Sequence, residues 1–205
     1  MTRHRLDRDF YRRDPRVVAP ALLNKILVNG ERSARIVEVE AYCGSIDPGS
    51  HAYKGMTARN ATMFGRPGGL YVYFTYGMHW CANAVCGGNG EGVAVLLRAA
   101  APLTGTGRMR EMRGRAARRD RDLCSGPAKL CEAFGLDRAF DGADLVTGDR
   151  GVTIVDDGTA PPAQPGNTVR IGLSAGAEHP WRWFVTGDEN VSANRRGQRQ
   201  RRPDT

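Results

Sequence analysis

Lysine, cysteine and long apolar runs are all scarce in this sequence, and each shortage excludes something. Only Lys25, Lys54 and Lys129 are lysines, so 27 of the 30 basic residues are arginines. No stretch approaches the roughly 20 apolar residues that a membrane-spanning helix needs. The N-terminal run MTRHRLDRDFYRRD carries acidic residues and has no apolar core. We therefore expect neither a signal peptide nor a membrane span.

The five cysteines are an odd number and form no CxxC pair. This pattern favours neither a zinc site nor a disulfide framework, so we expect small buried side chains in a reducing cytoplasm. A metal site can be drawn from His51, His79 and Glu40, but their spacing matches no metal-binding motif. We predict no metal and no cofactor.

Basic residues outnumber acidic residues in this sequence. The net charge is +8 and the pI is about 9.7, which favours a polyanion partner, either a nucleic acid or an anionic membrane surface. Arginine adds to this, because its guanidinium binds phosphate with two hydrogen bonds. A chain of 205 residues can form one substantial domain. We expect that domain at 1–193, followed by a basic, disordered tail at 194–205.

Hydrophobic periodicity predicts an α+β domain. Helices are expected at 7–13, after Asp14-Pro15, at 105–119 and at 127–134. Strands are expected at 25–28, 33–42, 70–75, 78–86, 93–100, 152–155, 169–173 and 181–185. The arginines of 105–119 form either a solvated basic face or a phosphate-contacting flank. The long irregular connection at 43–69 contains His51, Arg59 and Met63, and its length favours a functional role.

The most informative strand is 35–42, RIVEVEAY. Its alternation predicts that Val37 and Val39 face the core, while Ile36, Glu38, Glu40 and Tyr42 face the other way. A face with two carboxylates and an aromatic ring is a poor core, but it suits the wall of a pocket. Spacing alone favours Glu40 only slightly over Glu38 as a working carboxylate.

A second informative run, YVYFTYGMHW, covers residues 71–80. Aromatic residues are common in strands, and this ordinary propensity is the expected explanation for Tyr71. Tyr76 differs because it adjoins Gly77 at the predicted hairpin tip, where an aromatic side chain would be exposed. On a basic protein, an exposed aromatic tip suggests a side chain inserted into nucleic acid.

Five strings in order, RIVEVEAY, HAYKGMTARN, MFGRPGGLYVYFTYGMHWCAN, VLLRA and LCSGPAKL, resemble the 3-methyladenine DNA glycosylase family of the mammalian alkyladenine type. The resemblance extends over roughly residues 6–192. It implies a single mixed α/β domain with a curved antiparallel sheet and a β-hairpin that enters the DNA minor groove. It also implies removal of alkylated or deaminated purines without a metal.

The resemblance assigns catalytic roles to two residues. Glu40 matches the general base that activates the attacking water, and Arg98 matches a residue close to the base and water. The chemistry agrees, because a carboxylate beside the oxocarbenium-like transition state can deprotonate water and stabilise positive charge. Glu38 remains the competitor, with a structural role as an arginine partner.

The resemblance also assigns residues to the damaged base. Tyr42, His51 and Tyr73 match side chains that stack against or cushion the flipped purine, and Asn83 matches a residue that crowds the exocyclic amine of guanine. Stacking contributes roughly 1–3 kcal/mol per base.

At the hairpin, Tyr76 matches the residue that fills the gap in the duplex, and Met78 flanks it. His79 departs from the family pattern, which has an aromatic residue there, so its DNA contact is undetermined. The loop 87–92 is about two residues longer than the mammalian pattern.

The sequence thus predicts a monomeric, monofunctional glycosylase that acts on double-stranded DNA containing 3-methyladenine, 7-methylguanine, hypoxanthine or ethenoadenine. A glycosylase with lyase activity would need an amine nucleophile, for which Lys54 and Lys129 are the candidates. Two other functions stay open: a nucleic-acid-binding module without catalysis, and a hydrolase of free nucleosides.

Overall fold

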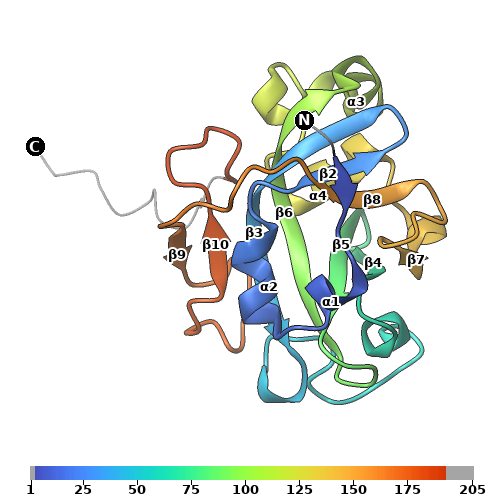
Figure 1. Ribbon diagram of the computed structural model, residues 1–205, viewed down its shortest axis with the longest axis vertical. Coiled ribbons are helices and arrows are strands. Elements are labelled where there is room, and N and C mark those ends of the chain that lie inside the picture. Colours follow the sequence, from blue (N-terminus) through green and yellow to red (C-terminus); the bar gives the residue numbers. More distant parts are fainter. Residues whose placement is uncertain (1–2, 193–205) are drawn as a thin grey trace, which may run out of the picture.

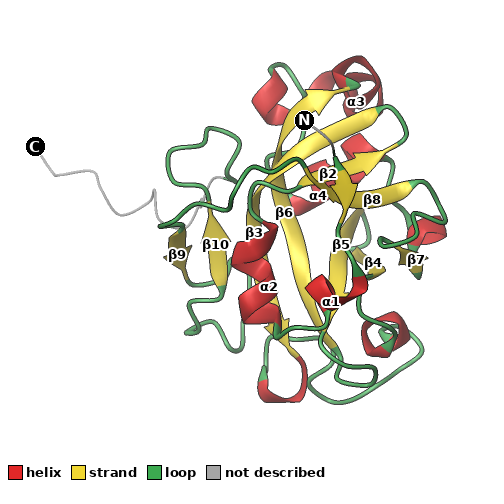
Figure 2. Ribbon diagram, viewed as in Figure 1, coloured by secondary structure: helices red, strands yellow, loops and turns green. Residues whose placement is uncertain are grey.

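The computed structural model describes residues 3–192, which form a strongly curved antiparallel sheet with short helices packed against it (Figures 1 and 2). This confirms the predicted α+β class. The sheet order is β1-β8-β2-β3-β6-β5-β4-β7, and β10 joins both β3 and β9. The strands are β1 (His4–Arg5), β2 (Ile26–Asn29), β3 (Arg32–Cys43), β4 (Gly69–Thr75), β5 (His79–Cys86), β6 (Val93–Thr104), β7 (Ala143–Asp144), β8 (Val152–Asp156), β9 (Gly166–Thr168) and β10 (Arg182–Phe184).

The helices are short. They comprise α1 (Arg8–Tyr11), α2 (Pro15–Leu22), α3 (Thr106–Arg113) and α4 (Pro127–Phe134), with 3₁₀ turns η1 (Gly44–Ile46), η2 (Ala61–Phe64), η3 (Gly114–Ala116), η4 (Asp120–Asp122) and η5 (Arg138–Phe140). Helix α2 begins where the sequence predicts, because Asp14 accepts a hydrogen bond from the Arg16 backbone N–H and Pro15 occupies the first turn. Helix α2 packs on β3, and α4 packs on β5 and β6.

Strand β3 is the centre of the fold. It pairs with β6 along one edge, from Ser33 to Cys43. On its other edge it pairs first with β2, up to Arg35, and then with β10, whose Arg182 lies opposite Glu40. Because both edges of the Glu40 region are paired, its backbone is held on both sides.

A β-bulge interrupts β3 and corrects the predicted faces. The register with β6 shifts between Ile36 and Glu38 and again between Glu38 and Val39. Bulged residues break the strict two-residue alternation, so Ile36 joins Val39 in the main hydrophobic core while Val37 lies outside that cluster. The prediction that Ile36 shares the pocket face was therefore wrong, whereas the core position of Val39 is confirmed.

Two predicted elements differ from the structure. The arginine-rich helix stops at Arg113 instead of residue 119, because Gly114 takes a positive φ of 55° and ends it. The chain at 169–173 is not a strand, since β9 ends at Thr168 and the residues after it form irregular chain. Most arginines of the segment 105–119 form ion pairs with acidic side chains, for example Arg108 with Glu111.

The predicted basic tail at 194–205 lies outside the described residues. Within residues 3–192, no helix is long and apolar enough to cross a membrane.

Candidate active site

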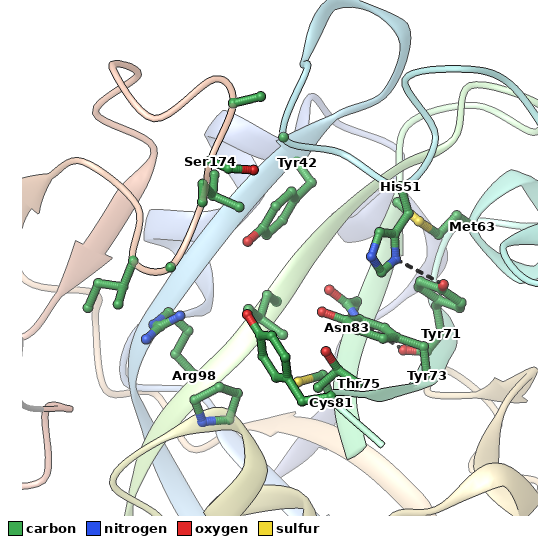
Figure 3. Close-up of a pocket in the computed structure, with 18 of the residues that line it drawn as sticks. Tyr42, His51, Met63, Tyr71, Tyr73, Thr75, Cys81, Asn83, Arg98 and Ser174 are labelled. Carbon is green, nitrogen blue, oxygen red and sulfur yellow. Dashed lines mark hydrogen bonds between the residues drawn. The ribbon is translucent and has the colours of Figure 1, made fainter. Parts of the chain in front are cut away.

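A cavity of about 310 Å³ opens against β3, β4, β5 and β6. Its volume lies at the small end of the range of roughly 300–1,000 Å³ that is typical of ligand sites. Tyr42 and Arg98 approach it from one side, and His51, Tyr71 and Tyr73 from the other (Figure 3). The irregular chain from Ile171 to Ala175 closes a further wall. The cavity can hold one flat aromatic molecule between ring-bearing walls.

The wall opposite Tyr42 is built from three rings. Tyr71 and Tyr73 stand on the same face of β4, two residues apart, and their ring centroids lie 5.3 Å apart. The His51 ring meets Tyr73 edge-on at 4.5 Å. His51 Nδ1 and the Tyr71 hydroxyl are 3.2 Å apart and share a hydrogen bond. The loop at 43–69 therefore supplies a pocket ring, in line with its predicted functional role.

The protonation of this wall follows from burial. Burial lowers the pKa of His51, and the charge of Arg59 lowers it further. Burial raises the pKa of Tyr71 to about 12. Near neutral pH this wall is therefore uncharged, with a neutral imidazole beside a protonated phenol.

Glu40 lies directly behind the cavity and not in its lining. Its side chain is fully buried. It accepts hydrogen bonds from the Tyr42 hydroxyl at 3.0 Å and from the Ile171 backbone N–H at 2.8 Å. Its Oε1 also lies 3.1 Å from Nη1 of Arg98. All three partners line the cavity. Glu40 is therefore in direct contact with residues that would touch a molecule bound there.

Glu38 has no exposed surface and is surrounded by donors. It accepts hydrogen bonds from Nε of Arg98 at 2.8 Å, Nε of Arg182 at 2.7 Å, and the backbone N–H and hydroxyl of Ser192 at 2.6 and 2.8 Å. Burial alone would raise the pKa of Glu38, but the two guanidinium groups outweigh it and hold that pKa below its usual value. Glu38 is therefore the arginine partner that the sequence suggested, and it fixes Arg98.

Tyr76 occupies the tip of the β4–β5 hairpin. The backbone N–H of Met78 donates to the Thr75 carbonyl across the turn, and both Tyr76 (φ 52°) and Gly77 (φ 67°) have positive φ. Positive φ suits glycine but strains tyrosine by about 1–2 kcal/mol. The Tyr76 side chain is nevertheless 81% exposed. Folding gains nothing from this arrangement, so it indicates a functional role.

The structure brings most of the predicted residues together. The cavity lining includes Tyr42, His51, Tyr73, Tyr76, Asn83 and Arg98. Asn83 is buried, and its Nδ2 donates to the Tyr71 carbonyl at 3.2 Å. Met78 and His79 are exposed at the hairpin tip and do not line the cavity.

Sequence reasoning missed two parts of the site. Tyr71 was assigned to ordinary strand packing, yet it lines the cavity and binds His51. The wall from Ile171 to Ala175 overlaps the predicted strand at 169–173 and was not predicted to line the cavity. No local pattern distinguishes this wall, because its backbone contact to Glu40 depends on which side of β3 the chain crosses.

No three His, Cys, Asp or Glu side chains among residues 3–192 gather closely enough to hold a metal ion. All five cysteines are buried and none forms a disulfide, as predicted.

Comparisons with known proteins show which family this chain resembles. The family model for methylpurine-DNA glycosylase (MPG) matches residues 9–189. A Burkholderia lata protein is 57% identical over 188 residues, which cover 91% of this chain and 90% of the relative. A Streptomyces avermitilis protein is 46% identical over 93% of this chain and 92% of its own length. A Rubrobacter xylanophilus protein is 49% identical over 82% and 86%. All three bear the name "Putative 3-methyladenine DNA glycosylase".

Proposed function

This chain belongs to the methylpurine-DNA glycosylase family, and from that membership we propose that it excises alkylated or deaminated purines from double-stranded DNA. The observation that carries the proposal is the buried Glu40 carboxylate, held by Arg98, Tyr42 and the Ile171 N–H behind an aromatic cavity. Water and a flipped base would meet at this point. The product is DNA with an abasic site.

The first step is extrusion of the damaged nucleotide. A base in a duplex cannot present its glycosidic carbon to a pocket, so it must be flipped out at a cost of a few kcal/mol. The exposed ring of Tyr76 adjoins the cavity and would fill the gap that the base leaves. Insertion of this ring offsets part of the lost stacking.

The second step is recognition of the flipped purine. Tyr42 on one side and Tyr73 with His51 on the other would contact its faces. Alkylated purines are cationic and electron-poor, so they stack well on aromatic rings. Asn83, fixed by the Tyr71 carbonyl, would crowd the exocyclic amine of normal guanine. A neutral imidazole at His51 would bind the base edge and would not act as a general acid.

The third step is attack by water. The water oxygen bonds to C1′ of the sugar, the N-glycosidic bond breaks, and its electron pair leaves with the purine. Glu40 accepts the proton of the water and stabilises the positive charge on the sugar. A carboxylate can accept about four hydrogen bonds, and three partners among the described residues approach Glu40. Capacity for a water therefore remains.

Glu40 belongs to a buried cluster whose charges balance. Glu38 and Glu40 are fully buried with Arg98 and Arg182, two negative charges against two positive ones. A charge-balanced buried cluster whose members are hydrogen-bonded to one another is tolerated, whereas an isolated buried charge is not.

We propose direct hydrolysis without a lyase step. Neither Lys54 nor Lys129 lines the cavity, and Lys129 donates to Ser125 at 3.2 Å. Borohydride treatment of the reaction should therefore trap no covalent protein–DNA adduct. A trapped adduct would overturn the monofunctional mechanism.

The test of the function is a release assay on duplexes that carry 3-methyladenine, 7-methylguanine, hypoxanthine or ethenoadenine, with the matching free nucleosides in parallel. We expect release of damaged purines from duplexes only. Release from free nucleosides at similar rates would indicate a nucleoside hydrolase. Tight binding without any release would indicate a binding module.

A further inference from the structure

The Arg170 side chain has no exposed surface and does not line the cavity, yet it is among the most heavily hydrogen-bonded side chains near the site. Its two terminal nitrogens bind both carboxylate oxygens of Asp47 at 2.6 and 2.7 Å. They also donate to the carbonyls of Ala41 and Gly176, both at 2.9 Å. Arg170 thus ties the end of β3, the loop after it and the 171–175 wall to one another.

Asp47 completes this arrangement from the other side. It is also fully buried, and it accepts hydrogen bonds from the backbone N–H groups of Cys43 at 3.0 Å and Gly49 at 2.9 Å. Burial by itself would raise the pKa of Asp47, but its bonds to Arg170 and to these N–H groups hold that pKa below its usual value. We call Arg170 and Asp47 the clamp.

The clamp touches both functional elements of the site. The Arg170 guanidinium lies over the Tyr42 ring, 4.7 Å from its centroid. Because Arg170 does not line the cavity and Tyr42 does, the guanidinium backs the ring and leaves the other face for a base. The next residue, Ile171, donates its backbone N–H to Glu40 at 2.8 Å.

The wall has little else to hold it. Residues 171–175 belong to no helix or strand of the described chain, so no ladder of backbone hydrogen bonds fixes them. Instead, this wall lies very close to the loop that follows β3. A Cβ on Gly49 would lie 2.9 Å from the Ala175 carbonyl oxygen and 3.0 Å from Nη2 of Arg170, which leaves no room for a side chain.

We propose that Arg170, held by Asp47, is a positioning residue that sets the plane of Tyr42 and the orientation of Glu40 together. The proposal rests on the glycosylase function above. A fully buried ion pair is a weak source of stability, because desolvation offsets its attraction. Its bidentate geometry, by contrast, fixes direction. A displacement of about 1 Å at a reacting group can slow a reaction by about 100-fold.

The test compares Arg170→Lys with Arg8→Lys. Arg8 is a matched control, because it binds both oxygens of the buried Asp144 and the Pro67 carbonyl, but it is not among the cavity residues. Lysine keeps the charge in both cases and loses the fork. The readouts are the thermal midpoint, the affinity for undamaged duplex, and the single-turnover rate on saturating duplex carrying the lesion that the native protein releases fastest.

We expect Arg170→Lys to lower the single-turnover rate by about 30- to 100-fold, with affinity for undamaged duplex within about twofold. Arg8→Lys should leave the rate within about threefold at matched folded fraction. Equal rates in the two variants would overturn the clamp but not the glycosylase function. A native protein that releases none of the four lesions would overturn the function itself.

Asp47→Asn provides a second measurement if Arg170→Lys does not fold. It keeps the side-chain volume and weakens the fork, so it should slow the single-turnover step by about tenfold while Arg8→Lys does not. Failure of both clamp variants to fold would also refute the proposal, because the clamp would then be a requirement of folding.

Discussion

Replacement of Glu40 by glutamine is the sharpest test of the proposed chemistry, because the structure predicts that the variant fits. The Gln oxygen can take the place of Oε1, where it still accepts from the Ile171 N–H and faces Arg98. The Gln amide nitrogen then replaces Oε2 and donates to the Tyr42 hydroxyl, which turns from donor to acceptor. The packing is retained and only the charge is lost.

The stability change should be small because two effects oppose each other. The Arg98–Glu40 separation of 3.1 Å corresponds to about 5 kcal/mol of attraction at an effective dielectric constant of about 20. The carboxylate no longer has to be desolvated, which returns several kcal/mol. Arg98 also keeps Glu38 as a partner. We expect the free energy of unfolding to change by no more than about 2 kcal/mol.

The rate should fall far more. Loss of a general base costs about 10²- to 10⁴-fold, which is about 2.7–5.5 kcal/mol of activation free energy. Single-turnover release on saturating duplex measures this step, and a fluorescence titration checks that the variant still binds the damaged duplex. Glu111→Gln, an exposed substitution of the same kind on α3, is the control. A Glu40→Gln rate within about fivefold of the native rate would refute the role of Glu40.

Three further outcomes follow from the same geometry. Tyr76→Asn places a residue that tolerates positive φ at the strained tip, so the urea midpoint should hold or rise while excision falls by about 5- to 150-fold; unchanged excision would refute the wedge. Glu38→Gln leaves Arg182 without its carboxylate, so unfolding free energy should drop by about 3–5 kcal/mol and single-turnover release should slow; an equally stable, fully active variant would contradict this. The pKa values of Glu38 and Asp47 are lowered in the folded state. The two carboxylates therefore stabilise the fold at any pH above the ordinary pKa of a carboxyl group, and this stability is lost as the pH falls through the lowered pKa values. Urea titrations should show that these two carboxyl groups cause a loss of stability below about pH 4.5; constant stability from pH 5 down to pH 3 would be inconsistent with these shifts.

Local chemistry along the chain was sufficient to predict most elements. The Asp14-Pro15 start of α2, the β2–β3 hairpin around Asn29-Gly30, and α4 from Pro127 to Phe134 all form as expected. These features depend on caps, turns and periodicity, which involve residues close in sequence. The ordered motifs and the aromatic hairpin likewise indicate the family from the sequence alone.

The separation of Glu38 from Glu40 required the tertiary structure. The two residues have the same side chain on the same strand, and sequence spacing barely distinguishes them. A bulge in β3, the crossing of β10, and the return of the chain at Ser192 give Glu38 two arginines and two serine donors. Glu40 is instead bound by three residues that line the cavity, namely Tyr42, Ile171 and Arg98.

The sequence by itself therefore determined most elements, the hairpin tip and the family, because these follow from contacts between near neighbours and from ordered motifs. Only the tertiary structure decided which carboxylate faces the cavity residues, why Tyr71 belongs to the site, and how Arg170 reaches both Tyr42 and Glu40. These contacts join residues up to 131 positions apart. Their partners depend on how the curved sheet brings distant segments together, which no local pattern encodes.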